Sequence, residues 1–95
     1  MYFVYIIETE DGTYYTGQTN DLLRRFKEHV SGTSHSAAYF RMHPPLYLVH
    51  VEECKSRKLA LKRERLIQRN RRLKMSLIGS RRHLLEVIES ESSYR

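Results

Sequence analysis

The sequence predicts a small α/β domain of the α+β kind, in which helices flank a three-stranded, mainly antiparallel sheet. A chain of 95 residues buries only one modest core, so a second independent domain has no room. Runs rich in aromatic and β-branched residues open the chain and return near its middle, whereas apolar residues with helical spacing dominate the second half. The predicted order is therefore two strands, a helix, a short helix, a third strand and then further helices.

Two strands that form a hairpin open the predicted fold. Residues 2–8 are aromatic and β-branched without a helical stripe, residues 10–12 (Glu-Asp-Gly) supply turn chemistry, and residues 13–16 are again β-rich. The third strand is predicted over residues 46–52, directly after two prolines.

A helix is predicted after the hairpin. Gly17 ends the second strand, and Thr19 or Asn20 can cap a helix that runs to about Ser31. Its apolar residues recur at i, i+4 and i+8: Leu22, Phe26 and Val30. Residues 36–42 are predicted to form a short helix, which the two following prolines stop.

The second half of the chain is predicted to be mostly helical. From Ser56 the apolar spacing becomes helical, and residues 69–72 interrupt this helix before a second one continues through Ile78. The apolar seam consists of Leu59, Leu66 and Leu73, seven apart, beside Ala60 and Ile67. A last small helix contains Leu84, Leu85 and Ile88, and residues 90–95 are expected to be a frayed tail. We therefore assign residues 1–80 to the domain and residues 81–95 to a C-terminal short helix and tail.

The positive charge of the chain is concentrated in its C-terminal half. The net charge is +6, and twelve of the seventeen Lys and Arg residues lie between Lys55 and Arg82, a window whose single acid is Glu64. Such a surface suits a polyphosphate partner, which it binds by releasing counterions. The alternative is a solvated helix that only keeps the protein soluble.

Several classes of protein are not expected from this sequence. No apolar run approaches the roughly 20 residues of a membrane span, and the N-terminus lacks the pattern of a secretory signal, so a cytoplasmic location is expected. The single Cys54 has no partner for a disulfide and is interpreted as a small apolar strand residue. The five histidines do not form the helical pair around a glutamate that zinc proteases need.

Two tyrosines are candidates for one pocket. Side chains alternate along strands, so Tyr5 and Tyr15, ten apart across a hairpin, are expected on the same face of the sheet. The alternative for either residue is a tyrosine that packs its ring and exposes its hydroxyl to water.

The first helix supplies a polar stripe beside its apolar face. Asp21, Arg25 and His29 recur at i, i+4 and i+8. An arginine near the start of this helix points back over the sheet, where its guanidinium can grip a phosphate. The alternatives are an exposed ion pair between Asp21 and Arg25, and a histidine on the surface.

Glu64 is the unusual acid of the basic half. Its neighbours at i±3 and i±4 are Ala60, Leu61, Ile67 and Gln68, which place it beside the apolar seam. A lone carboxylate among cations is a candidate ligand for Mg²⁺ or Mn²⁺, ions that often take one protein carboxylate plus water and phosphate oxygens. The alternative is pairing within the helix to Lys58, Arg63 or Arg65.

Taken together, these residues resemble the GIY-YIG nuclease superfamily, which includes homing endonucleases, restriction enzymes and repair nucleases. The resemblance rests on the motifs Val4-Tyr5-Ile6 and Tyr15-Thr16-Gly17, the helix of residues 18–29, and then Tyr39-Phe40-Arg41, Pro45-Leu46 and Ala60-Leu61-Lys62-Arg63-Glu64. It covers residues 3 to about 78, and the chain most resembles the short stand-alone bacterial members of the superfamily.

The resemblance implies a role for each matching residue. Tyr5 and Tyr15 match the two family tyrosines, one of which activates the attacking water, and Arg25 matches the arginine that contacts the scissile phosphate. His29 falls where members have His or Tyr near the reacting centre, and Glu64 matches the glutamate that holds one divalent ion, Mg²⁺ or Mn²⁺. The implied nucleic-acid contacts are Arg24, Arg25, His35, Arg41, Lys62 and Arg63.

The chain also departs from the family pattern. Gln18 stands where some members have a lysine that assists the tyrosine, which weakens the expected activation of the base. Phe3 replaces the first glycine and Thr16 the isoleucine of the name motif, changes that strand packing can absorb. The loop of residues 32–38 lacks the lysines of many relatives, so a DNA contact is expected to be either missing or replaced by His35.

The resemblance implies a metal-dependent endonuclease that hydrolyses phosphodiester bonds in DNA, with structure-directed cleavage in repair or recombination. One alternative is a non-catalytic nucleic-acid-binding module that retains the fold, and another is a basic protein-interaction domain. The sequence leaves open whether DNA or RNA is cut, which tyrosine activates the water, and the oligomeric state.

Overall fold

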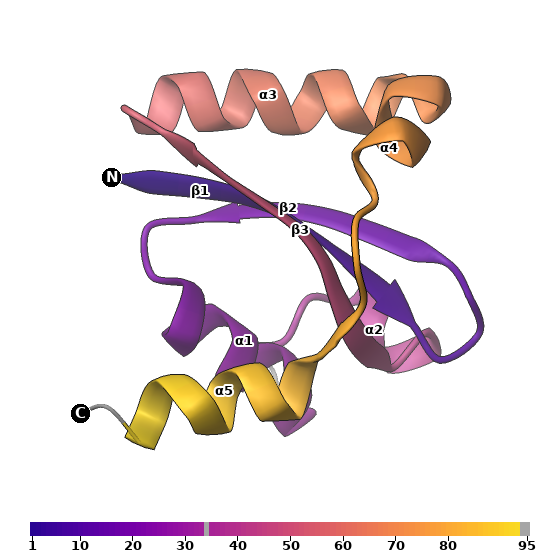
Figure 1. The fold of residues 1–95 in the computed structure, drawn as a ribbon, viewed down its shortest axis with the longest axis vertical. Helices are drawn as coiled ribbons and strands as arrows, with labels where there is room; N and C mark the ends of the chain where they lie inside the picture. Colours follow the sequence, from indigo (N-terminus) through magenta and orange to yellow (C-terminus); the bar gives the residue numbers. More distant parts are fainter. Residues whose placement is uncertain (34, 94–95) are drawn as a thin grey trace.

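The structure, a computed structural model, describes residues 1–33 and 35–93 (Figure 1). In chain order its elements are β1 (Tyr2–Thr9), β2 (Tyr14–Thr19), α1 (Leu22–Ser31), α2 (Tyr39–Met42), β3 (Pro45–Cys54), α3 (Arg57–Arg69), α4 (Arg71–Leu77), β4 (Arg82–His83) and α5 (Leu84–Ser93). This order confirms the predicted α+β class.

The elements form three layers around a central antiparallel sheet. Helices α3 and α4 lie on one face of the sheet, and α1, α2 and α5 lie on the other (Figure 1). The strand order is β2-β1-β3-β4, so β2 forms one edge. Within the described ranges, no helix is both long and apolar enough to span a bilayer.

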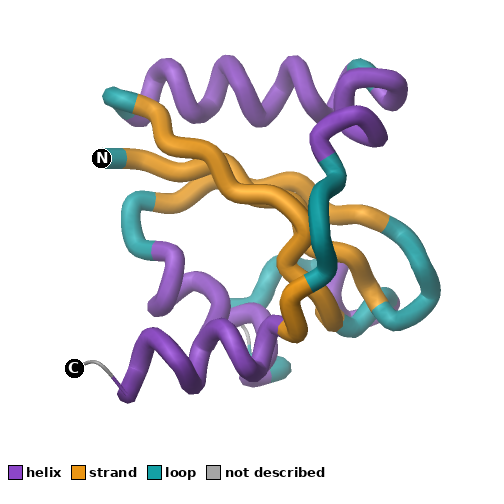
Figure 2. The backbone as a smooth tube through the Cα atoms, in the orientation of Figure 1, coloured by secondary structure: helices purple, strands orange, loops and turns teal. Residues whose placement is uncertain are grey.

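The sheet has four strands, one more than the sequence predicts. The extra strand, β4, has two residues and pairs with β3 through Tyr47–His83 and Leu48–Arg82. Figure 2 shows the segment after α4 crossing beside the sheet before it enters this strand and then α5. A strand of two residues is too short to show the alternation by which strands are recognised in a sequence.

Alternation along β1 gives the domain a hydrophobic core on each face of the sheet. Tyr5 and Ile7 face α1 and α5, where they pack with the buried residues Phe26, Phe40, Leu48 and Leu84. Val4 and Ile6 face α3, where they pack with the buried residues Val49, Ala60 and Ile67.

The apolar seam of α3 differs from the predicted one. Ala60 and Ile67 are 0% exposed, whereas Leu59 and Leu66 are 49% and 50% exposed. The helix therefore rests on the sheet along the row that contains alanine, because a small side chain allows the helix and strands to approach closely.

Two predictions about helix ends were wrong, one for the start of α1 and one for the end of α5. The N-cap of α1 is Asp21, whose carboxylate accepts a hydrogen bond from the backbone N–H of Arg24, and not Thr19 or Asn20. The Thr19 hydroxyl instead accepts from the N–H of Asp21 and so shapes the turn before the helix. At the C-terminus α5 continues to Ser93, so residues 90–93 are helical and not frayed; the rest of the predicted tail, residues 94–95, lies outside the described residues.

Candidate active site

Two tyrosines from neighbouring strands form the centre of the site. Tyr5 on β1 is opposite Gly17 and Tyr15 on β2 is opposite Ile7, so the phenols are diagonal neighbours on one face of the sheet. Their ring centroids are 6.3 Å apart. Tyr5 is fully buried and Tyr15 is half-buried. The two rings therefore line one site beneath the edge strand, as the alternation in the sequence predicts.

Gly17 leaves room for the Tyr5 phenol. A Cβ at this position would lie 2.5 Å from Tyr5 Oη and 2.9 Å from Tyr15 Cε1, closer than real Cβ contacts. The glycine also lies inside β2 and does not end it, which corrects the predicted strand boundary. Sequence reasoning missed this role, although a glycine inside a β-rich run often marks close approach of another group to the backbone.

His29 on α1 lies within hydrogen-bonding distance of the Tyr5 hydroxyl. Its side chain lies in the core, 2% exposed, so the alternative of a surface histidine is wrong. The Nε2 atom is 2.8 Å from Tyr5 Oη. Burial, reinforced by the positive charge of Arg25, lowers the pKa of His29 to about 4. The imidazole is therefore neutral at neutral pH.

The contact of the second ring nitrogen of His29, Nδ1, indicates which of the two ring nitrogens carries the hydrogen of the neutral imidazole. The backbone N–H of Ala37 donates to Nδ1 over 3.5 Å, so Nδ1 acts as the acceptor. A neutral imidazole then has its hydrogen on Nε2, which donates to Tyr5 Oη. A donor directed at the phenol oxygen favours negative charge on that oxygen.

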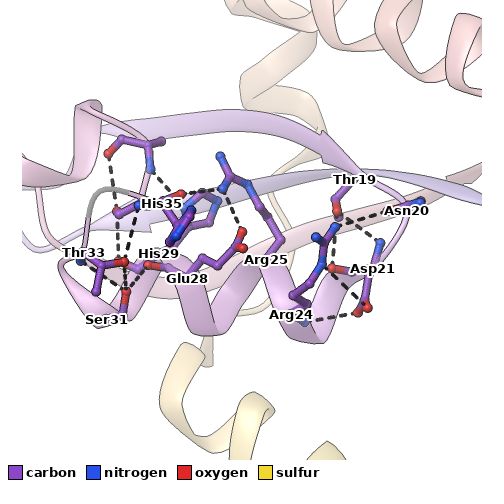
Figure 3. Close-up of polar contacts among 12 residues, drawn as sticks. Thr19, Asn20, Asp21, Arg24, Arg25, Glu28, His29, Ser31, Thr33 and His35 are labelled. Carbon is purple, nitrogen blue, oxygen red and sulfur yellow. Dashed lines mark hydrogen bonds and ion pairs between the residues drawn. The ribbon is translucent and has the colours of Figure 1, made fainter.

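Arg25 lies one turn before His29 and is held by two partners. Its Nη1 donates to Glu28 Oε1 over 2.9 Å and to the backbone carbonyl of His35 over 2.6 Å (Figure 3). The alternative, an ion pair between Arg25 and Asp21, does not form, because Asp21 caps the helix and its carboxylate lies near Arg24. The guanidinium remains part-exposed.

The two phenols respond to the charges around them. Burial raises the pKa of both tyrosines, and for Tyr5 the neighbouring Tyr15 adds to the rise. The positive charge of Arg25 lowers the pKa of both phenols, whereas the negative charge of Glu64 raises it. Both phenols are therefore protonated at neutral pH unless further positive charge is brought to the site.

Glu64 reaches the site from α3, on the other side of the edge strand. Its charge acts on both phenols, and burial raises its own pKa. In the part of the chain that the structure describes, its carboxylate makes no hydrogen bond or salt bridge, and Arg63 pairs with Glu52 instead. The alternative of pairing to Arg63 is therefore wrong.

This carboxylate suits a divalent ion. Mg²⁺ typically takes one or two protein carboxylates and completes its shell with water and phosphate oxygens. Glu64 offers an unpaired carboxylate, and no group of three or more His, Cys, Asp or Glu side chains is gathered for a metal among the described residues. The single carboxylate of Glu64 therefore fits an ion that completes its shell with water and substrate oxygens.

The residues expected to contact nucleic acid are not gathered in one place. Arg24 is exposed beside Arg25, and the exposed Lys62 lies on α3. Arg63 is engaged by Glu52 through two hydrogen bonds. Arg41 lies on α2, and the side chain of His35 is exposed while its backbone carbonyl holds Arg25.

Comparisons with known proteins identify the family of this chain. Residues 1–76 match the GIY-YIG catalytic domain. The UPF0213 protein of Halobacterium salinarum is 45% identical over 78 residues, which cover 81% of this chain and 99% of that protein. The UPF0213 protein of Desulfotalea psychrophila is 45% identical over 67 residues, which cover 70% of this chain and 60% of that protein. A solution NMR structure of a UPF0213 protein from Bacillus halodurans has a TM-score of 0.50 and 39% identity, covering 81% of this chain and 82% of that one.

Proposed function

This chain belongs to the GIY-YIG nuclease family, and we propose that it is a divalent-metal-dependent endonuclease that hydrolyses phosphodiester bonds in DNA. One observation carries the proposal: side chains from β1, β2, α1 and α3 converge on the edge strand β2. They are Tyr5, Tyr15, Arg25, His29 and Glu64. This set combines a proton acceptor, a cation for phosphate and a carboxylate for a metal, as phosphodiester hydrolysis by water requires.

In the proposed reaction each side chain has a separate task. One tyrosine, as a phenolate that has lost its proton to solvent, accepts the proton of the attacking water, whose oxygen bonds to phosphorus as the P–O bond to the leaving oxygen breaks. The Nε2–H of His29 stabilises negative charge on Tyr5 Oη. Arg25 donates hydrogen bonds to oxygens of the scissile phosphate and stabilises the charge that develops there. A divalent ion held by Glu64, when bound, supplies further positive charge to the same phosphate.

The resting contacts of Arg25 imply a rearrangement when substrate binds. The hydrogen bonds of Arg25 to Glu28 and to the His35 carbonyl both use Nη1, so at least one of them is exchanged or shared when Nη1 binds a phosphate. Glu28, being negative, is repelled by the incoming phosphate, whereas the carbonyl of His35 is neutral. We expect the bond to Glu28 to open first.

The test is a cleavage assay on supercoiled and branched DNA with Mg²⁺ or Mn²⁺. Wild type should nick or cleave, and Glu64→Ala and Arg25→Ala should lose cleavage while their far-UV spectra and unfolding midpoints stay near those of wild type. The matched controls are Glu53→Ala and Arg72→Ala, exposed residues of the same types away from the site, which should retain cleavage. Undiminished cleavage by Glu64→Ala and Arg25→Ala would reject the assignment.

A second function is favoured by one feature of the site. That feature is its resting state: Nη1 of Arg25 is hydrogen-bonded to protein groups and both phenols, whose pKa is raised, are protonated. This state also suits a nucleic-acid-binding module without turnover. Salt-dependent binding of DNA with no cleavage across several metals and substrate shapes would favour this alternative.

A further inference from the structure

A hollow of about 460 Å³ opens beside the candidate active site, where β2 ends and α1 and α3 begin. Its volume falls within the roughly 300–1,000 Å³ of ligand pockets, so it is large enough for more than a single ion. The residues that matter for its chemistry are Gln18, Asn20, Arg24, Arg25, Glu28 and Arg57. Arg25 belongs both to this hollow and to the candidate active site, so the two are continuous.

The hollow is positively charged. Three of its lining residues are arginines, which come from two different helices, and its single acid, Glu28, is hydrogen-bonded to Arg25. Arg24 has only loose partners, a 3.8 Å contact with Asp21 and a 3.4 Å hydrogen bond to Asn20, and is mostly exposed (Figure 3). An anion that enters the hollow therefore meets the guanidinium group of Arg24, which is free to turn toward it.

Arg57 has no evident structural role. It is the first residue of α3, where its positive charge opposes the helix dipole, and it is exposed. Among the described residues it makes no salt bridge or side-chain hydrogen bond. Arg57 therefore does not stabilise its own helix, and it lines a hollow that contains two more arginines. Such a cation is suited to binding an anionic ligand.

A polar atom in the wall indicates that this ligand also has a hydrogen-bond donor. Gln18 lines the hollow, and its side-chain oxygen is buried without a hydrogen-bond partner in the described part of the chain, so this oxygen meets a ligand in the hollow once the amide turns toward it. A buried acceptor without a donor is costly, so a ligand that supplies one is favoured. Nucleotides combine the two properties, because they have a phosphate together with sugar hydroxyl or base N–H groups.

We propose that this hollow is a nucleotide subsite that binds the phosphate next to the scissile one. Arg24 and Arg57 grip that phosphate, Arg25 faces the scissile phosphate, and Gln18 accepts a hydrogen bond from the nucleoside. The inference rests on the proposed function, which identifies the ligand as part of a DNA strand. In this arrangement the bound DNA runs from Arg25 along the end of β2 toward the start of α3.

The experiment is an NMR titration of the full chain with thymidine 3′,5′-bisphosphate, a ligand with two phosphates on one nucleoside. In wild type, the signals of Arg24, Arg57 and Gln18 should shift together with those of Arg25. Arg57→Gln should weaken binding by about tenfold, the loss of one hydrogen bond to a charged group. The matched control is Arg69→Gln at the opposite end of α3, which should bind like wild type.

Two further arms separate the nucleotide from a free anion. Gln18→Ala should weaken binding of the bisphosphate but not of inorganic phosphate, which has no nucleoside group for Gln18. Because Arg57 opposes the helix dipole, Arg57→Gln should keep the unfolding midpoint of wild type, so a loss of binding is not a loss of fold.

The outcomes also separate this subsite from the proposed function. Equal affinity in Arg57→Gln and Arg69→Gln, or shifts confined to Arg25 and the tyrosines, would overturn the subsite even if DNA is cleaved. Equal loss of both ligands in Gln18→Ala would reduce it to a phosphate site and overturn the nucleotide proposal. Failure of DNA cleavage alongside the expected shifts would reject the endonuclease and leave the subsite as a nucleotide-binding site.

Discussion

Mild acid should destabilise this protein through His29 before the carboxylates titrate. In the unfolded chain His29 binds a proton with a pKa of 6.5, whereas burial lowers its pKa in the folded protein to about 4. Between these values the unfolded state binds more protons, so the free energy of unfolding falls as the pH falls. The full difference of 2.5 pKa units corresponds to about 3 kcal/mol, of which about 2 kcal/mol is lost between pH 7 and pH 5.

The carboxylates act in a lower window. Asp11, Glu28 and Glu52 have pKa values below their ordinary 3.8 or 4.5, so the stability that they contribute is lost only as the pH falls below those values. These three carboxylates therefore add little to the loss between pH 7 and pH 5, and Glu64, whose pKa is raised by burial, changes the stability in the opposite direction. The comparison of wild type with His29→Gln then isolates the histidine.

The assay is urea unfolding of wild type and His29→Gln, followed by far-UV circular dichroism at pH 7, 6 and 5. Wild type should lose about 2 kcal/mol across this range, and the variant should lose much less, whatever its stability at pH 7. His35→Gln, which changes an exposed histidine, is the control and should retain the dependence of wild type. The same loss in His29→Gln as in wild type would refute the assignment of a buried, neutral His29.

Three further changes have definite expectations. Gly17→Ala forces the phenol opposite it to move, so urea unfolding should show a loss of about 1–3 kcal/mol, and DNA cleavage should fall with it; unchanged stability would contradict the tight contact. Ile67→Ala should cost about 2–5 kcal/mol by the same measurement, whereas Leu66→Ala, half-exposed on the same helix, should cost far less; equal costs would contradict the seam described here. Glu28→Gln removes a negative charge that faces the substrate, so DNA anisotropy titrations should show tighter binding with a salt slope steeper by up to about one; weaker binding would contradict this role.

Much of the fold follows from local patterns in the sequence. The turn at residues 10–12 and the helix break at Asn70 were predictable, because turn and capping residues act within a few positions of themselves. The burial of Ala60 in place of Leu59 could not be predicted, since the two residues are neighbours on the helix. Only the packing of α3 on the sheet decides which of the two rows of side chains faces the sheet. Strand β4 was not predictable for a similar reason, since its two residues pair with β3, a strand far away in the sequence.

Some features of the candidate site could likewise be predicted from the sequence, and others could not. That Tyr5 and Tyr15 share a face was predictable, because strand alternation and a short hairpin leave little choice. The burial of His29 depends on Phe40 and Ala37, which the following loop brings back over the ring, and no local pattern reports such a contact. The partners of Arg25 are hidden for the same reason, since the carbonyl of His35 lies ten residues away.

The position of the site on the edge strand has a physical basis. An edge strand has unpaired backbone groups that invite another strand, and natural proteins cover them. Here the side chain of Gln68 donates to the carbonyl of Thr16, and Lys74 donates to that of Tyr14, so α3 and α4 cover the first part of β2. Neither contact extends to Gln18, where the hollow begins. These contacts thus end before the hollow, and the proposed subsite lies beside the part of the edge that they leave uncovered.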